Sequence, residues 1–160
     1  MSARALAAIL LVAAAAQPPQ SARVVIGYVA SSEDEPSNPG RLAVPLPTSG
    51  AKTAWVWEAG CRMAAASDRE PPGDADQSWT FVVDLVRGSD NLPAARLRYR
   101  HTSANGRATP EETRVLRLDS ADALDMNEVS ARTDCRYDRV HITASAETAR
   151  ATSAAVLWPR

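Results

Sequence analysis

Four arginines have the type and spacing to bind an acidic ligand. Arg96, Arg98 and Arg100 alternate along one expected strand. Arg117 is expected across the next hairpin, which would complete a basic stripe that could hold carboxylate or phosphate groups. The other interpretation is a solvated face that Asp84 partly neutralises. Arg96 opposite Arg117 would be unfavourable without a nearby carboxylate or an acidic partner, and this conflict makes the four arginines the candidate binding residues.

Two tryptophans have the spacing of the flat aromatic platforms that stack sugar rings. Trp55 and Trp57 are two residues apart, so they share one face of an expected strand. If they were exposed, they would favour carbohydrate binding. The same face carries Cys61 and Met63, and this pattern favours a place in the core, where large aromatic side chains usually pack.

No motif in the chain predicts a catalytic residue, a metal site or a cofactor. The Gly-x-Ser-x-Gly elbow, the phosphate-cradling Gly loop and the His-Glu-x-x-His pair do not occur. The acidic residues lack the alternating pattern of a calcium loop, and no close Cys or His pairs give a zinc spacing. The enzymatic alternative is a small exported hydrolase whose site is assembled from distant residues, such as His101 or His141 with Asp84.

Cys61 and Cys135 are the only cysteines in the chain. An even number of cysteines in an exported protein predicts a disulfide, here a single one between two sheets. In the loop-entropy model, closing a loop of this length stabilises the fold by about 4.5 kcal/mol at most.

The N-terminus has the three-part layout of a secretory signal peptide. Arg4 is followed by an uncharged apolar run from Ala5 to Ala16, and a pair of prolines ends that run. Small residues at Ala14 and Ala16 predict cleavage after Ala16. The run is shorter than the roughly 20 apolar residues that an anchor needs, and no later segment is long enough either. We therefore expect a secreted or periplasmic protein.

The rest of the chain suits one domain, with a flexible leader at residues 17–22 and the folded part at residues 23–160. The net charge of −1 argues against nucleic acid and against a polybasic membrane-surface protein. Lys52 is the only lysine among many arginines and alanines, a composition typical of a GC-rich bacterial genome.

Short runs of alternating hydrophobicity, separated by Gly, Pro and Asn turns, predict the elements that must position these residues. The expected strands cover residues 23–30, 41–46, 53–63, 78–86, 94–102, 139–146 and 154–158. Residues 41–46 contain Pro45, which places that strand at a sheet edge. Residues 120–127 could be a single helical turn capped by Ser120 or the start of a strand. This pattern predicts an all-β, antiparallel sandwich.

Two hairpins follow from the same pattern. Pairing of residues 78–86 with 94–102 aligns apolar and opposite-charge partners, namely Val83 with Leu97, Phe81 with Tyr99 and Asp84 with Arg96. The next turn is marked by Asn105-Gly106. A two-residue loop there would set Leu97 opposite Arg114, whereas a four-residue loop sets it opposite Leu116 and sets Ala95 opposite Leu118, which we expect.

The succession Cys61, Trp79, Cys135 is similar to the immunoglobulin pattern, in which two cysteines on facing sheets pack around a tryptophan. Thr133 stands two residues before the second cysteine, where that pattern has a tyrosine. The similarity therefore concerns architecture, and an immunoglobulin-like sandwich is one possible arrangement.

Together these features favour a non-catalytic binding or assembly module of the envelope or the extracellular space. Its expected partner is an envelope or extracellular protein or an acidic ligand. The hydrolase and the carbohydrate-binding module are the alternatives.

Overall fold

The computed structural model describes residues 22–32, 39–129, 134–135 and 137–148. The expected signal peptide at residues 1–16 and the expected last strand at residues 154–158 lie outside this part of the chain. So does the expected leader, apart from Ala22, where the first strand begins. No helix in the described part is long and apolar enough to cross a membrane.

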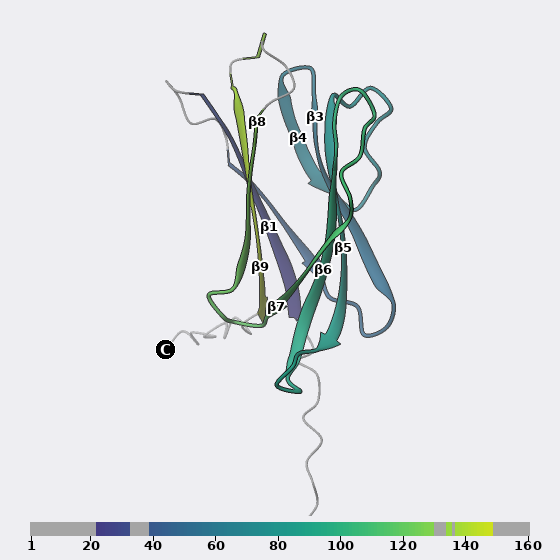
Figure 1. Ribbon diagram of the computed structural model, residues 1–160, viewed down its shortest axis with the longest axis vertical. Coiled ribbons are helices and arrows are strands. Elements are labelled where there is room, and N and C mark those ends of the chain that lie inside the picture. Colours follow the sequence, from purple (N-terminus) through teal and green to yellow (C-terminus); the bar gives the residue numbers. More distant parts are fainter. Residues whose placement is uncertain (1–21, 33–38, 130–133, 136, 149–160) are drawn as a thin grey trace, which may run out of the picture.

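The described strands form two facing antiparallel sheets (Figure 1). They are β1 (Ala22–Ser31), β2 (Gly40–Pro45), β3 (Ala51–Ala59), β4 (Arg62–Ser67), β5 (Gln77–Arg87), β6 (Pro93–Thr102), β7 (Glu112–Arg117), β8 (Ala123–Val129) and β9 (Arg139–Thr148). The four-stranded sheet has the order β2-β1-β9-β8, and the five-stranded sheet has the order β4-β3-β5-β6-β7. The predicted all-β antiparallel sandwich is confirmed.

The core lies between the two sheets, because every second side chain of each central strand points inward. Trp79, Phe81 and Leu97 of the five-stranded sheet are fully buried in one cluster with Ile26 and Ile142 of the four-stranded sheet. The strand order differs from that of immunoglobulin domains. The similarity to that pattern therefore ends at two sheets, a disulfide between them and a buried tryptophan.

The β5–β6 hairpin has the predicted register. Val83 lies opposite Leu97, Phe81 opposite Tyr99 and Asp84 opposite Arg96. The pattern also placed β2 correctly at a sheet edge. Of the two alternatives for residues 120–127, a helical turn or the start of a strand, the structure has the strand, β8. Ser120 lies in the turn before β8, where its hydroxyl accepts a hydrogen bond from the backbone NH of Asp122.

The predicted register of β6 with β7 is wrong. Leu97 lies opposite Arg114, and Ala95 lies opposite Leu116. The turn is tighter than expected, with the NH of Gly106 donating to the carbonyl of Ser103 at 2.8 Å. An edge strand tolerates this register, because Leu116 is the only β7 residue that has to enter the core.

The predicted faces of β3 are also reversed. Ala54, Val56 and Glu58 point inward and are fully buried, whereas Trp55 and Trp57 point outward. On the neighbouring strand β5, the large side chains of Trp79 and Phe81 lie in the core beside Val56 and Ala54, the smaller apolar residues of β3. The charge of Glu58 made its own face look like the solvent face.

The expected strand at residues 53–63 is interrupted by a hairpin turn. Gly60 and Cys61 both have positive φ angles, 54° and 62°, and connect β3 directly to β4. Two central residues with positive φ are typical of the type I′ turn, whose twist matches that of the flanking strands. Cys61 therefore lies in a turn rather than on a strand face.

Candidate functional site

The outer face of the five-stranded sheet carries both tryptophans that we expected in the core. Trp55 and Trp57 are half-buried and do not belong to the core cluster or to the side chains packed against it. On β5 their neighbours are small hydroxyl side chains, Thr80 opposite Trp55 and Ser78 opposite Trp57. These neighbours are short, so on the β5 side the two indole rings lie next to small hydroxyl side chains.

The same face carries the predicted arginines on β6. Thr80 pairs with Trp55 on one side and with Arg100 on the other, so a single row runs from tryptophan to hydroxyl to arginine. Arg98 comes two residues earlier on β6 and points to the same face. We name the surface formed by Trp55, Trp57, Ser78, Thr80, Arg98 and Arg100 the Trp–Arg face.

The sheet is irregular beside the tryptophans. The register of β3 with β4 shifts between Trp55, which pairs with Ser67, and Trp57, which pairs with Ala64. This shift places one more residue on β4 than on β3 and forms a bulge. Bulges bend a strand and re-aim its side chains, and they are frequent next to binding sites.

The three β6 arginines differ in how far they are neutralised. Arg96 makes a bidentate contact with Asp84, which is 8% exposed, and this contact raises the pKa of Arg96. Arg98 has Glu111 at 3.7 Å, while its buried Nε has no hydrogen-bond partner among the described residues. Arg100 is exposed and has no ion pair within the described part of the chain. Uncompensated positive charge therefore increases along β6 toward the tryptophans.

Arg117 lies on the same outer face as the β6 arginines, but it is not opposite Arg96. The register of β7 sets Val115 opposite Arg96 and Arg117 opposite Ala94. Arg117 instead contacts Asp90 at 3.2 Å in the β5–β6 turn. The expected conflict between Arg96 and Arg117 is absent, because the prediction used the wrong register.

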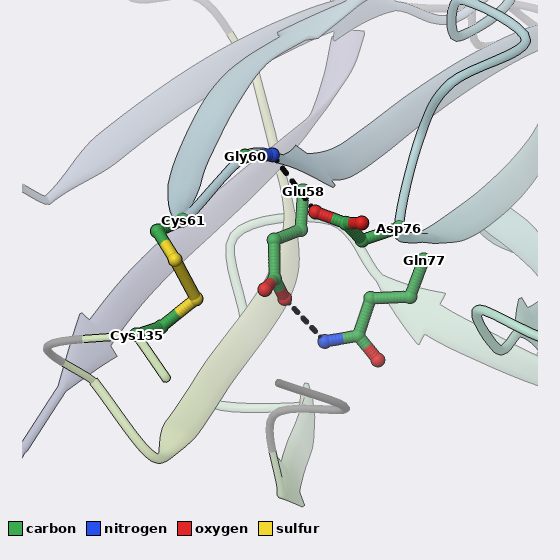
Figure 2. The surroundings of a disulfide bond; sticks show 6 residues. All are labelled: Glu58, Gly60, Cys61, Asp76, Gln77 and Cys135. Carbon is green, nitrogen blue, oxygen red and sulfur yellow. Dashed lines mark hydrogen bonds between the residues drawn. A yellow bond between two sulfur atoms is a disulfide. The ribbon is translucent and has the colours of Figure 1, made fainter. Parts of the chain in front are cut away.

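A polar group lies between the sheets at the disulfide end of the sandwich. Glu58 and Gln77 are buried, and the Gln77 amide donates to the Glu58 carboxylate at 2.5 Å (Figure 2). The amide oxygen of Gln77 lies 3.1 Å from Nε2 of His101, whose ring stacks on Trp79 at a centroid distance of 4.9 Å. Burial lowers the pKa of His101, and the negative charges of Glu128 and Glu58 partly oppose this effect.

Cys61 and Cys135 form the predicted disulfide, with Cα atoms 5.1 Å apart (Figure 2). It joins the β3–β4 turn to the segment before β9 and so ties one sheet to the other. Asp134 lies close to both sulfur atoms. Both thiols are consumed by the bond, so this cluster offers no thiolate to a metal ion. The neighbouring turn is held by Asp76, whose carboxylate accepts the NH of Gly60 at 2.8 Å.

The structure does not assemble the expected hydrolase residues. Asp84 belongs to the outer face of β5, whereas His101 pairs with the buried Trp79 and points inward. His141 lies on the other sheet, 3.5 Å from Asp125. In the described part of the chain no hydroxyl group forms a hydrogen bond with either histidine side chain.

Two open grooves of similar size are found, and the first borders the Trp–Arg face through Thr53 and Ser67, the β4 partner of Trp55. One, of about 510 Å³, runs along β2 and the starts of β3 and the β4–β5 connection, and includes Lys52 and Asp68. The other, of about 520 Å³, lies on the four-stranded sheet over Gly27 and includes His141. Neither groove includes Trp55, Trp57 or a β6 arginine.

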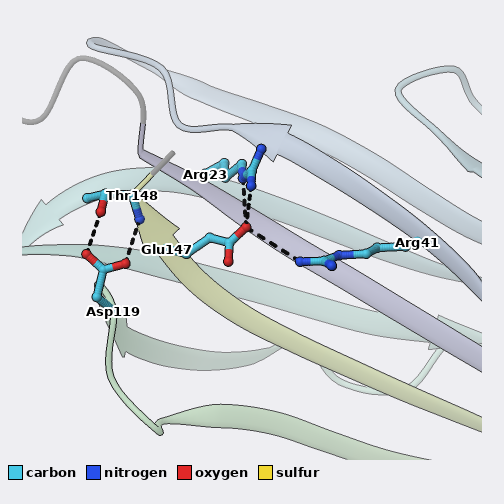
Figure 3. Close-up of polar contacts among 5 residues, drawn as sticks. All are labelled: Arg23, Arg41, Asp119, Glu147 and Thr148. Carbon is cyan, nitrogen blue, oxygen red and sulfur yellow. Dashed lines mark hydrogen bonds and ion pairs between the residues drawn. The ribbon is translucent and has the colours of Figure 1, made fainter. Parts of the chain in front are cut away.

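Charges at the centre of the four-stranded sheet's outer face are paired. Arg23 donates to the carboxylate of Glu147 at 2.7 Å, and Arg41 approaches the same oxygen at 3.5 Å (Figure 3). At the end of β9, Thr148 donates its backbone NH to Asp119 at 2.9 Å, which ties the β7–β8 turn to β9. These contacts hold the scaffold together.

The sequence pattern does not indicate the polar group formed by Glu58 and Gln77, and it predicts the wrong side of the sheet for Trp55 and Trp57. Gly60 was the available signal, because a glycine inside a strand pattern indicates a bulge or a turn. Comparison with protein-family models, with curated proteins and with solved structures finds no match to this chain.

Proposed function

We propose that this chain is an exported, non-catalytic carbohydrate-binding module and that the Trp–Arg face is its binding surface. The observation that carries the proposal is the outward position of Trp55 and Trp57 on the outer face of the five-stranded sheet. Indole rings present a broad apolar surface to the CH groups of a sugar ring, and their NH groups can donate to its hydroxyls.

The surroundings of the tryptophans support this function. Ser78 and Thr80 add hydroxyl groups that can both donate and accept hydrogen bonds, as sugar hydroxyls require. Trp55 and Trp57 are about 7 Å apart along the strand, so neighbouring rings of one polymer could each meet an indole. An extended ligand suits a flat face better than a closed cavity does.

An exported location supports the same function. The apolar N-terminal run and the disulfide both favour a compartment outside the cytoplasm. Carbohydrate polymers are abundant there, which makes them an accessible class of ligand.

A protein-docking role has less support. The large exposed hydrophobic residues among the described ones are Leu92 in the β5–β6 turn, Val115 in β7 and Val129 in β8. Scattered apolar residues of this kind are normal on a protein surface and do not form a docking patch.

The test is a binding screen of the purified protein against soluble polysaccharides: dextran, xylan, polygalacturonate and its methyl ester. We expect at least one polymer to change the tryptophan fluorescence with saturation. The variant Trp55→Ala/Trp57→Ala should lose that binding, while Trp55→Phe/Trp57→Phe, which keeps aromatic rings, should retain part of it. Equal binding by the wild type and the alanine variant, or no binding of any polymer, would contradict the proposal.

A further inference from the structure

We infer that the carbohydrate bound by the Trp–Arg face is acidic, with a carboxylate on the sugar ring held by Arg100 and Arg98. This inference rests on the proposed function and adds the chemical class of the ligand. An acidic ligand is inferred from where the arginines lie relative to the tryptophans, and not from how many arginines there are.

The first observation is the row that crosses the sheet from Trp55 through Thr80 to Arg100. The strands that carry Trp55 and Arg100 are two strand spacings apart, about 10 Å. A sugar ring stacked on the indole would lie over the short side chain of Thr80. Its exocyclic group would then point toward the guanidinium of Arg100.

The second observation is the unused hydrogen-bonding capacity of the two arginines. Arg100 has no ion pair among the described residues, and Nε of Arg98 is buried with no hydrogen-bond partner there. Nε of Arg98 is covered by the protein, so a ligand would meet the terminal nitrogens of the guanidinium group, of which Nη1 lies 3.7 Å from Glu111. A guanidinium group matches the planar geometry of a carboxylate with two parallel hydrogen bonds.

The third observation is the contrast with Arg96 on the same strand. Asp84 occupies the guanidinium of Arg96 through a bidentate contact. The end of β6 far from the tryptophans is therefore neutralised within the protein, while the end beside them is not. Charge complementarity thus points to an acidic group next to the stacked sugar.

The experiment compares polygalacturonate with its methyl ester, because the two share a backbone and differ in the carboxylate charge. We expect the ester to bind at least about 10-fold more weakly, the range for losing a hydrogen bond to a charged group. Arg100→Gln and Arg98→Gln should each weaken polygalacturonate binding by a similar factor and leave ester binding unchanged. Dextran sulfate against dextran distinguishes sulfate from carboxylate as the recognised acid.

Arg139→Gln is the matched control, because Arg139 is also exposed, has no ion pair among the described residues and lies on the opposite sheet. It should bind polygalacturonate like the wild type. If Arg139→Gln weakened binding as much as Arg100→Gln, general charge attraction would explain the effect and the inference would be wrong. If the ester bound as tightly as the acid, the inference would fail and the proposed sugar binding would stand. If no polymer bound, the proposed function itself would fail.

Discussion

The outer faces of the two sheets differ in how their arginines are paired with carboxylates. On the four-stranded sheet, Arg23 and Arg41 share the carboxylate of Glu147, so both of these arginines are paired within the protein (Figure 3). On the five-stranded sheet, Arg100 stands beside Trp55 without an ion pair among the described residues. Ion pairs that are complete within the chain serve the fold, whereas an unpaired arginine beside an outward tryptophan is available to a ligand.

Arg139 shows that an unpaired arginine is not enough by itself. It lies on the four-stranded sheet, and none of the tryptophans in the described residues points outward there. The difference between the faces is thus the combination of aromatic, hydroxyl and cationic side chains in one row. Substitutions on each face test how much that face contributes to stability and how much it contributes to ligand binding.

The largest expected effect comes from the bond that joins the two sheets. Replacing both Cys61 and Cys135 with serine should lower the free energy of unfolding by about 2–4 kcal/mol, because the unfolded chain loses a constraint across 74 residues. Urea denaturation monitored by fluorescence measures this change. If the stability stayed the same, the disulfide would not be what holds the sheets in register.

The next effect distinguishes the buried His101 from the exposed His141. Burial lowers the pKa of His101, so between its ordinary value near 6.5 and the lower folded value the unfolded chain binds more protons. The free energy of unfolding should therefore fall as the pH drops from about 7.5 to about 5.5. His101→Gln should reduce this slope, measured by urea denaturation at several pH values.

His141→Gln is the control for that prediction, because His141 is 43% exposed on the outer face of the four-stranded sheet. Its pH slope should match that of the wild type. A slope that persisted in His101→Gln and disappeared in His141→Gln would show that the outer face, and not the interior, carries the pH dependence.

A smaller effect tests the paired charges of the four-stranded sheet. Glu147→Gln should destabilise the protein by at most about 1 kcal/mol, as is usual for partly exposed ion pairs, and should leave polygalacturonate binding unchanged. Thermal unfolding and calorimetric titration measure the two properties. A loss of binding in Glu147→Gln would indicate that the ligand binds the four-stranded sheet, and this would contradict binding at the Trp–Arg face.

The smallest effect on stability is expected on the Trp–Arg face. Arg100→Gln should unfold like the wild type, because the side chain is exposed and makes no ion pair in the described part of the chain. The same variant should bind polygalacturonate more weakly. A clear destabilisation by Arg100→Gln would indicate a structural role and remove the contrast between the two faces.

The sequence predicted the fold best where several signals agreed. Along β5 and β6, alternation, turn residues and the pair of Asp84 with Arg96 all gave the same register, and the structure has that register. The disulfide followed from two cysteines in a chain expected to be exported. The β6–β7 register could not be found in this way, because one buried residue on an edge strand fixes it only weakly.

The candidate site was harder to predict because β3 is apolar on both faces. Alternation predicts that the more hydrophobic face of a strand is buried in the core. Because Trp55 and Trp57 are larger apolar residues than Ala54 and Val56, the pattern predicts burial of the wrong face. The deciding fact is Glu58, a buried carboxylate that Gln77 hydrogen-bonds from the neighbouring strand. A local sequence pattern does not reveal this hydrogen-bond partner, because Gln77 becomes the neighbour of Glu58 only when β3 pairs with β5.

The most direct test of the central claim is an NMR titration with an oligomer of galacturonic acid, following the backbone amide signals and the indole NH signals of the tryptophans. The account predicts that the signals of Trp55 and Trp57 shift with saturation, while that of the fully buried Trp79 does not. Shifts confined to the four-stranded sheet, for example at Thr143 and Ser145 in the groove over Gly27, would contradict it.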